Sequence, residues 1–478
     1  MVSPGEMGSC LSPRDWLLFE PRPVWSGRSN QRKQKQPYGM DENPSKIEKT
    51  SDPRGSAPAG SAVARSNVLG LLAERHPQVD IPESVLAYAE EQEANGHRIC
   101  RADSREPLTS FLLRIGADEP TVHGFLDDDS RLRSRLSYPP LLRCPIGDLR
   151  SRMEEDFGAV FSLQQAVLDS SLLTGFNRHG IEHLRSVCSM ALKLLRVSGR
   201  GGEQGYQAER EAIIAGYLHD SGNLISRQYH GAYGAYLATQ FFGDVDDSEE
   251  TLSSFLRVLE AVLFHEVEIG LRLPSLAGLH PATLSLIIAD KTDVSARRVS
   301  SKSNVPEALR DAHTLVNLLT VNSQIGCQAR DFVWELHFSP RAESEDVTRF
   351  SHLLKASERV WVPQAWQRLY RDYNVEYLFV FHATFLKLYL ARLLYAIRAV
   401  FALYPDVQGF RLVVEDTERG ISLSRSFGRQ DYKEKIGLIG KNLFKDNWEE
   451  TYLYRSLWWQ RAVEGACKEA EIRAASAT

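Results

Sequence analysis

The feature that most constrains the fold is an apolar helical run that ends in a histidine beside an aspartate. Residues Ile213 to Leu218 have the composition of a buried helix that stops at Gly222, and His219-Asp220 stands directly before that stop. Histidine nitrogens and aspartate oxygens are common ligands of divalent transition metals. Most such pairs are ordinary capping or surface residues, so the doublet predicts a metal site only if distant ligands converge on it.

The overall composition is that of a soluble globular protein with room for two or three domains. The chain has 478 residues, of which 43% are hydrophobic and 25% charged. The net charge of -5 gives no sign of nucleic-acid binding through bulk electrostatics. The six cysteines are scattered and form no Cys-x-x-Cys pair, which argues against a thiolate zinc site or a disulfide scaffold and for a reducing compartment.

Residues 1–66 are predicted to be a disordered tail. Ser, Pro, Gly, Lys and Gln dominate this segment, so it cannot bury enough apolar surface to offset the entropy lost on ordering. No apolar core follows the start, so we expect no secretory signal and a cytoplasmic protein. An organellar transit peptide stays open as an alternative, although Glu6, Asp15 and Glu20 count against it.

Four segments are predicted after the tail, and the fold class they indicate is mainly α. Residues 67–160 look like a helical extension, in which Asp127–Asp129 is interpreted as a solvated loop or a helix start rather than a metal cluster. Residues 161–310 form the core that carries the chemistry. Residues 311–424 form a small α+β subdomain, and residues 425–478 a C-terminal helical extension.

Residues 161–310 place polar side chains at the ends or inward faces of successive helices. His183 opens a helix and shares its apolar face with Val187, and His179 lies one turn earlier on that side. His230 begins a segment rich in Gly and Ala, which suits a helix packed close against a neighbour. A lone histidine in such a position is most often a core or capping residue.

Two later helices add a histidine and a buried acid. Leu252 to Glu266 reads as an amphipathic helix that ends in His265-Glu266, with His265 on the face of Val258 and Val262. Asp290 shares a face with apolar residues of the next helix, so it is expected to be buried and to need a cation or strong hydrogen-bond donors. In a helical bundle all these positions can converge on one cavity.

The order of these residues resembles the HD superfamily of metal-dependent phosphohydrolases, over roughly residues 161–300 and only weakly beyond. The superfamily's minimal signature falls on His183, His219, Asp220 and Asp290, and the extra histidines of its binuclear members fall on His230 and His265. The segment from Ala289 to Val299 resembles the final helix of a bacterial-type branch. Asn223 stands where the HD-GYP branch has a lysine, and the GYP motif is missing, so cyclic dinucleotides are disfavoured.

The resemblance implies an HD-type helical bundle that holds two divalent ions, Mn, Fe or Mg, about 3.5–4 Å apart, around a bridging water. Asp220 would bridge the ions and hold the catalytic water. Glu266 would either support a metal ligand without touching the ions or transfer protons. One ion would take His183, His219 and Asp290, and the other His230 and His265. The residues implied for substrate binding are His179, Lys291, Arg297 and Arg298. The last three are placed on the helix of Asp290, where surface salt bridges are an equally good interpretation.

The C-terminal third differs in its pattern of apolar residues, which is typical of strands as well as of helices. Phe332–Phe338 and Gly409–Val414 alternate like strands, and Tyr377–Tyr404 reads as a long apolar helix that covers a small sheet and offers a surface for a homodimer. Charged residues interrupt this helix, and its longest uncharged run is too short to span a bilayer, so no membrane partner is expected. A last helix around Trp458-Trp459 is expected to pack back onto the body.

The function predicted from the sequence is hydrolysis of a small phosphorylated molecule, a nucleotide being one candidate, by metal-activated water. No nucleic-acid partner is expected. Two alternatives stay open. Some HD-fold oxygenases use a similar set of six ligands for a di-iron centre, and a nucleotide-binding regulatory protein with weak turnover would retain part of the site.

Overall fold

The computed structural model describes the following residues: 138–170, 180–200, 203–225, 229–242, 245, 248–299, 316–317, 319–338, 376–417 and 420–444. They all belong to one of two compact units of the chain, Ala62–Thr478, whereas the other unit, Met1–Ser61, lies outside the described residues. The predictions for the tail, for Asp127–Asp129, for His179 and for the helix around Trp458-Trp459 also fall outside them.

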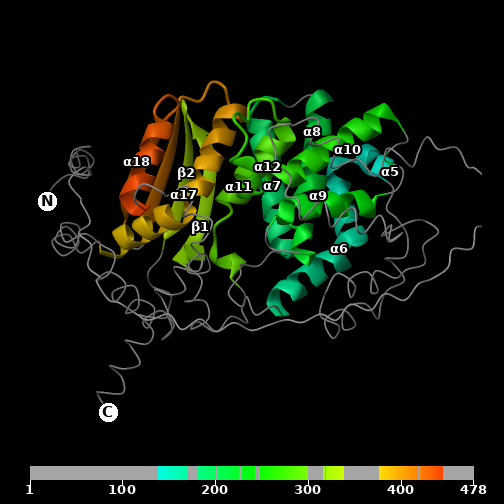
Figure 1. Cartoon of the computed structure of the whole chain (residues 1–478), viewed down its shortest axis with the longest axis horizontal. Coiled ribbons are helices and arrows are strands. Elements are labelled where there is room, and N and C mark those ends of the chain that lie inside the picture. The colour runs from blue at the N-terminus through cyan, green and yellow to red at the C-terminus, as the bar shows by residue number, and fades with distance from the viewer. Residues whose placement is uncertain are drawn as a thin grey trace, which may run out of the picture. The chain divides into compact units, whose positions relative to one another are not determined.

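Helices account for 65% of the described residues, which confirms the mainly α fold class. The helical part is made of the following elements (Figure 1): α5 (Tyr138–Arg143), α6 (Ile146–Ser170), α7 (Ile181–Val197), α8 (Glu203–Leu218), η4 (Ser221–Leu224), α9 (His230–Phe241), α10 (Glu249–Phe264), α11 (Val267–Gly270), α12 (Pro281–Thr292) and η5 (Ala296–Arg298).

Local sequence explains where the central helices begin. Ser248 is the N-cap of α10, where its hydroxyl accepts a hydrogen bond from the Thr251 amide at 3.1 Å, and two glutamates in the first turn favour the positive end of the helix dipole. Helix α12 starts with Pro281 at its first position, where a missing N–H costs nothing. The amphipathic helix predicted for Leu252 to Glu266 is α10, which begins three residues earlier, at Glu249, and ends at Phe264.

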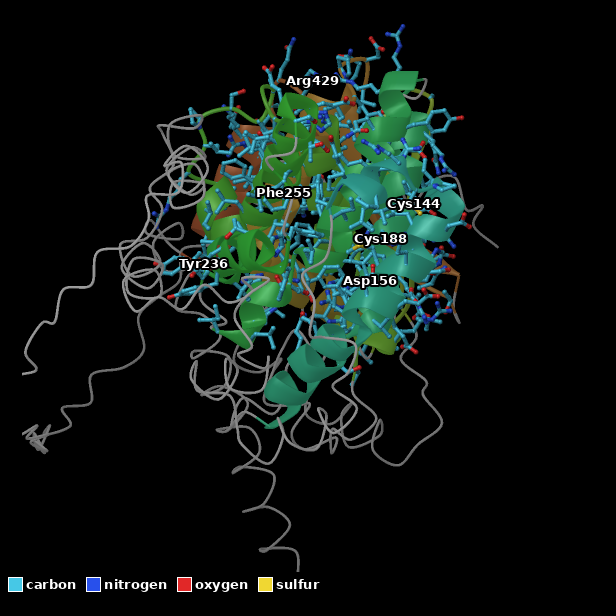
Figure 2. All side chains as sticks on the ribbon, turned by 90° about the vertical axis from the view of Figure 1, so that its right-hand side faces the viewer. Cys144, Asp156, Cys188, Tyr236, Phe255 and Arg429 are labelled. Carbon is cyan, nitrogen blue, oxygen red and sulfur yellow. The ribbon has the colours of Figure 1, made fainter. Side chains whose placement is uncertain are left out.

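The core lies between α7, α8, α10 and α12, which pack on one another. Cys188 of α7 and Phe255 of α10, both labelled in Figure 2, are fully buried within it. Burying one large apolar side chain contributes about 1.5–3 kcal/mol, so this interior dominates the stability of the bundle. A Cβ on Gly216 of α8 would lie 2.6 Å from the Cys188 sulfur, so the close approach of α7 and α8 requires a glycine there.

The described residues also form a four-stranded sheet in the order β1 (Thr320–Gln328), β2 (Asp331–Phe338), β3 (Gly409–Asp416) and β4 (Ile421–Gly428). The β1–β2 and β3–β4 pairs are antiparallel, and β2–β3 is parallel. Parallel neighbours need a crossover, and α17 (Glu376–Leu403) lies between β2 and β3 in the chain. The long apolar helix and the small sheet predicted from the sequence are therefore confirmed.

Aromatic side chains join α17 to the sheet. Phe385 packs edge-on against Trp334, and Phe381 lies against Phe338 with ring centroids 4.4 Å apart. Helix α18 (Tyr432–Phe444) contacts α17 and β4, and α17 also packs on α12. No described helix has the length and apolarity needed to cross a membrane.

Two of the expected segment boundaries fall inside regular elements. The boundary at 160/161 lies within α6, which continues to Ser170. Phe157 and Phe161, on either side of that boundary, stack on each other, and Phe157 also packs against Phe241 of α9. The boundary at 424/425 lies within β4, which stays paired with β3 as far as Gly428. The helical extension and the subdomain are thus continuous with the elements beside them.

Candidate metal centre

The His219-Asp220 doublet sits in the turn between α8 and η4, and both side chains are buried. Helix α8 ends at Leu218, so the doublet follows the helix end directly, and Gly222 lies within η4. A Cβ on Gly222 would overlap the carbonyl oxygen of His230, so only glycine allows η4 to lie this close to the start of α9. The doublet is thereby brought beside the next predicted ligand.

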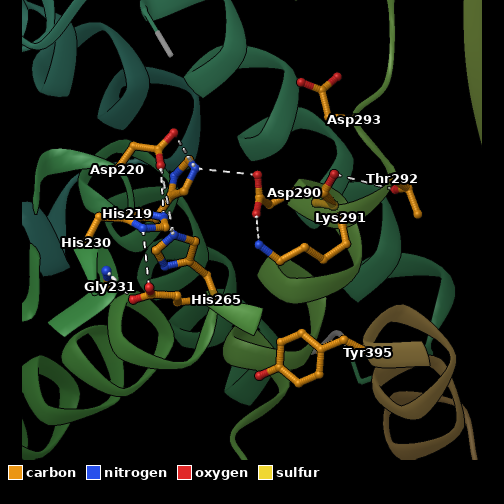
Figure 3. A network of polar contacts seen from close by, with 12 residues as sticks. His219, Asp220, His230, Gly231, His265, Asp290, Lys291, Thr292, Asp293 and Tyr395 are labelled. Carbon is orange, nitrogen blue, oxygen red and sulfur yellow. Dashed lines mark hydrogen bonds and ion pairs between the residues drawn. The ribbon is translucent and has the colours of Figure 1, made fainter. Parts of the chain in front are cut away.

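The structure brings together the six residues predicted as metal ligands, and Figure 3 labels all of them except His183. His183 comes from the first turn of α7, and His230 opens α9 after Tyr229, whose left-handed backbone (φ 60°) makes a sharp turn. His265 directly follows α10, and Asp290 lies in the last turn of α12. None of the six is more than 9% exposed, and their donor atoms form three overlapping groups in which all atoms lie within 4.8 Å of one another.

Asp220 stands between two pairs of histidines. Its Oδ2 atom lies 3.4 Å from His183 Nε2 and 3.2 Å from His219 Nε2, and its Oδ1 atom lies 3.6 Å from His230 Nε2 and 3.9 Å from His265 Nε2. The Oδ1 atom of Asp290 faces the first pair, at 3.5 Å and 3.8 Å. We call His183, His219 and Asp290 the His183 half, and His230 with His265 the His230 half, with Asp220 shared.

Two of the histidine rings are held in the tautomer that binds metals through Nε2. His219 Nδ1 lies 2.8 Å from the Gly216 carbonyl oxygen, and His265 Nδ1 lies 2.6 Å from the Val262 carbonyl oxygen. A carbonyl oxygen only accepts, so each Nδ1 donates its N–H there, and Nε2 is the nitrogen that carries the lone pair in this tautomer. These Nε2 atoms lie 3.3 Å from that of His183 and 3.0 Å from that of His230. Nitrogens this close need a shared proton or a cation, and the donor set fits a divalent cation.

Carboxylates surround His183 on both of its ring nitrogens. Asp293 Oδ2 lies 2.6 Å from His183 Nδ1, and the Ser186 hydroxyl donates to Asp293 Oδ1 at 3.0 Å. Burial alone would lower the pKa of His183, but Asp220, Asp290 and Asp293 together raise it to about 10. Burial would raise the pKa of Asp293, which His183 instead holds below its usual range. This corner therefore stabilises positive charge.

Asp293 is a residue that sequence reasoning missed as part of the site. Its contacts match the pattern in which a carboxylate orients a metal-binding histidine from the side opposite the metal. The signal was present as Asp290-Lys-Thr-Asp293, because two acids three residues apart lie about one helical turn apart.

Asp290 keeps its charge although it is buried. Lys291 Nζ lies 2.5 Å from Asp290 Oδ2, which leaves Oδ1 to face the histidines. Burial alone would raise the pKa of Asp290, but the charges of Lys291, His183 and His219 hold it well below its usual range. The expectation of a buried aspartate that needs a cation is confirmed, and the nearest cation is its own neighbour in the chain.

Glu266 supports the His230 half from outside. Its Oε2 atom accepts a hydrogen bond from the Gly231 amide at 2.8 Å, and its Oε1 atom lies 3.6 Å from His230 Nδ1, the ring nitrogen that faces away from Asp220. Burial would raise the pKa of Glu266, and the contact with His230 lowers it. Burial and the neighbouring His219 and His230 hold the pKa of His265 well below its usual range, which keeps that ring neutral.

Lys291 lies on the helix of Asp290 as predicted, but the prediction that Arg297 and Arg298 follow on the same helix is wrong. Helix α12 ends at Thr292, because the backbone of Asp293 leaves the helical conformation (ψ 84°) where its side chain binds His183 and Ser186. Arg297 is exposed on η5. Arg298 is 4% exposed, donates to the Asp293 carbonyl oxygen at 3.1 Å, and reaches within 3.5 Å of His183 Nε2.

A cavity of about 1320 Å³ borders the cluster at His183, Asp293 and Arg298. It continues along the exposed face of α7 to the edge strand β1. The cluster itself is nearly closed, and Arg298 both lines the cavity and approaches the Nε2 atom of His183.

Comparisons with known proteins leave the function to be argued from this geometry. No family model matches the chain, and no solved structure matches it. The chain is similar to the uncharacterised protein MJ1020 of Methanocaldococcus jannaschii, with 26% identity over 155 residues. The match covers 30% of this chain and 56% of the archaeal protein, so the chain spans little more than half of that relative.

Proposed function

We propose that this protein is a metal-dependent phosphohydrolase of the HD superfamily. The observation that carries the proposal is the position of Asp220, whose two carboxylate oxygens each face a separate pair of histidine Nε2 atoms. Asp220 is thus shared between two histidine pairs, and Asp290 faces only the pair His183 and His219. This arrangement of oxygen and nitrogen donors suits a pair of divalent ions. The resemblance of the sequence around His183, His219-Asp220 and Asp290 to that superfamily supports the same assignment.

The residues of the cluster have separate tasks in this proposal. His183, His219 and Asp290 hold one ion, His230 and His265 the other, and Asp220 is shared between them. Divalent ions bound there supply Lewis acidity toward a phosphoryl oxygen and lower the pKa of a bound water. Glu266 fixes the ring of His230 through its Nδ1 atom, and Asp293 does the same for His183, so we assign both as positioning residues.

Two cationic side chains, Arg298 and Lys291, lie beside the cluster and have different roles in this proposal. Arg298 lines the cavity and reaches the edge of the cluster, and its planar guanidinium can donate two parallel hydrogen bonds to phosphate oxygens. Lys291 stands behind Asp290 and offsets its charge, so that Asp290 stays ionised at neutral pH. In this proposal Arg298 binds the substrate and Lys291 maintains the cluster.

The test is a hydrolysis screen with the purified full-length chain. Phosphate monoesters and diesters are offered to protein loaded with Mn²⁺, Fe²⁺ or Mg²⁺, and released phosphate is measured beside metal content by elemental analysis. Asp220→Ala is expected to lose both halves of the centre and to fall more than about 100-fold in activity, because even a supporting residue of a metal ligand typically costs 10–100-fold. His382→Ala, on α17, is the matched control and should keep its turnover.

Three outcomes would contradict the proposal. The metal-loaded protein could hydrolyse no ester of the panel, or Asp220→Ala could be as active as the wild type. Oxygen consumption by iron-loaded protein without phosphate release would support the di-iron oxygenase alternative instead.

A further inference from the structure

The cavity beside the cluster is larger than a small phosphate ester requires. Its volume is about 1320 Å³, whereas pockets for drug-sized ligands commonly measure about 300–1,000 Å³. Its lining follows α7 from Ile181, past His183, as far as Lys193, which lies ten residues beyond His183. Ten residues of helix at about 1.5 Å each give a length of about 15 Å. A ligand whose phosphate lies at the cluster can therefore extend far along α7.

The far end of the cavity carries positive charge that is not neutralised. Lys193 Nζ donates to the Ile325 carbonyl oxygen of β1 at 3.3 Å, and Lys193 has no ion-pair partner among the described residues. Arg185, also on the cavity wall, differs because both of its donating nitrogens are held by the carboxylate of Glu154. Of the acids in the lining, Asp293 is engaged with His183, which leaves Glu182 near the start of α7.

The wall opposite α7 is formed by β1 of the sheet, and a hydrogen bond joins β1 to α12, the helix of Asp290. The Ser323 hydroxyl of β1 donates to the Thr292 carbonyl oxygen at the end of α12 at 2.7 Å, and it accepts from Trp334 Nε1 at 2.9 Å. Val321 of β1 is 59% exposed and lines the cavity together with Met190 of α7. The middle of the cavity thus has apolar side chains on both walls, between the cations at its two ends.

We propose that this cavity binds an extended phosphate compound with a second anionic group at the end remote from the cluster. Arg298 receives the phosphate at the inner end, Lys193 holds the second anion, and Met190 and Val321 contact the spacer between them. This inference rests on the proposed function, because it places the reacting phosphate at the cluster. It gives the C-terminal sheet a part in substrate selection through β1.

Calorimetric titration of the full-length chain tests the second anion site without turnover. The probes are octylphosphonate and octane bisphosphonate, which have the same spacer, are not hydrolysed, and differ only in the second anion. Each is titrated into manganese-loaded and into chelator-treated protein. The bisphosphonate is expected to bind about tenfold more tightly in both, which corresponds to one additional charge-assisted contact. Butane and dodecane bisphosphonates show whether the gain depends on length.

A variant assigns the gain to Lys193. Lys193→Ala should remove most of the advantage of the bisphosphonate and leave the affinity for octylphosphonate unchanged. Lys433→Ala on the exposed face of α18 is the matched control and should keep the advantage. Equal affinity of the two probes for the wild type, or a full advantage in Lys193→Ala, overturns the inference.

The design separates this inference from the proposed function. Turnover of p-nitrophenyl phosphate, which has one anion and no long spacer, measures the hydrolase activity apart from the second anion site. If the protein hydrolyses that ester but does not discriminate between the two phosphonates, the second anion site is wrong and the hydrolase assignment stands. If the bisphosphonate binds through Lys193 but no ester is hydrolysed, the proposed function fails instead.

Discussion

The two halves of the cluster hold the same kind of ligand by different means. In the His183 half two ionic contacts, Asp293 with His183 and Lys291 with Asp290, add to the Gly216 carbonyl that fixes His219. In the His230 half the support is mostly main chain. His265 is fixed by the Val262 carbonyl, and the one carboxylate there, Glu266, is itself held by the Gly231 amide.

The difference concerns charge. The His183 half combines two carboxylates, Asp220 and Asp290, with a histidine whose surroundings stabilise positive charge. The His230 half shares one carboxylate and includes His265, whose low pKa keeps it neutral. Because an anionic ligand attracts a cation more strongly than a neutral one, we expect the His183 half to bind a divalent ion more tightly.

The largest expected effect is on metal content. His230→Ala and His265→Ala should each reduce the protein to one ion per chain, because the ion of the His183 half keeps all of its own ligands. His183→Ala should remove the tighter ion, and elemental analysis of the three purified variants checks the order. If the first two variants keep full metal content and lose only substrate affinity, their histidines bind substrate and the two-half description fails.

A smaller effect is expected from the partner of His183. Asp293→Asn keeps the shape but loses the charge that faces Nδ1, so metal affinity of the His183 half should fall about 10–100-fold, as is typical when the partner of a ligating histidine is changed. Competition with a chelator measures it. Ser189→Ala is the control, since that hydroxyl lies on the same helix and bonds only to the Arg185 carbonyl. A loss of the same size in both variants would show that the charge of Asp293 is irrelevant.

His382 of α17 is a buried histidine whose pKa, unlike that of His183, is not raised by neighbouring carboxylates. Burial, and to a smaller extent the charge of Arg425, lowers its pKa from 6.5 to about 3. Below pH 6.5 the unfolded chain binds a proton that the folded chain refuses, so the free energy of unfolding should fall by about 1.4 kcal/mol per pH unit toward pH 3. Denaturant titrations of the wild type and His382→Phe at several pH values measure this slope. The variant should lose it, and identical slopes would contradict the assignment.

The smallest expected effect concerns a contact that reaches the His230 half from α17. Tyr395 donates from its hydroxyl to the Phe264 carbonyl oxygen at 2.5 Å, directly before His265 (Figure 3). Tyr395→Phe removes that hydrogen bond and should lower the free energy of unfolding by about 1 kcal/mol. It should also weaken the second metal ion and leave the first unchanged. Equal weakening of both ions would mean that α17 does not act on the His230 half in particular.

Periodicity predicted the parts of the site that depend on one helix at a time. The inward face of α7 places His183, and the apolar face of α12 places Asp290, so both could be recognised from spacing. The end of α12 could not, because it depends on contacts of Asp293 with residues more than a hundred positions earlier. The pairing of Lys291 with its neighbour was also hidden, since adjacent residues on a helix point to different faces.

The sheet was recognised from its central strands alone. β2 and β3 are apolar and largely buried, whereas β1 is an edge strand with mostly exposed or half-exposed residues and no clear alternation. β4 carried a readable signal in Ile-Ser-Leu-Ser-Arg-Ser-Phe, which alternates with a period of two. An arginine in one of the apolar positions and three serines weaken that signal.

The contact of Gly222 with the His230 carbonyl acts as a backbone spacer between the two halves. η4 directly follows His219-Asp220, and α9 begins with His230. The closest approach of Gly222 to the His230 carbonyl therefore limits how near His219 and His230 can come to each other. Ions of different radius therefore have to be accommodated by rotation of the imidazole rings, because the two segments cannot move closer. A single methyl group at position 222 would widen the gap and change which ions the centre can hold, although it touches none of the ligands.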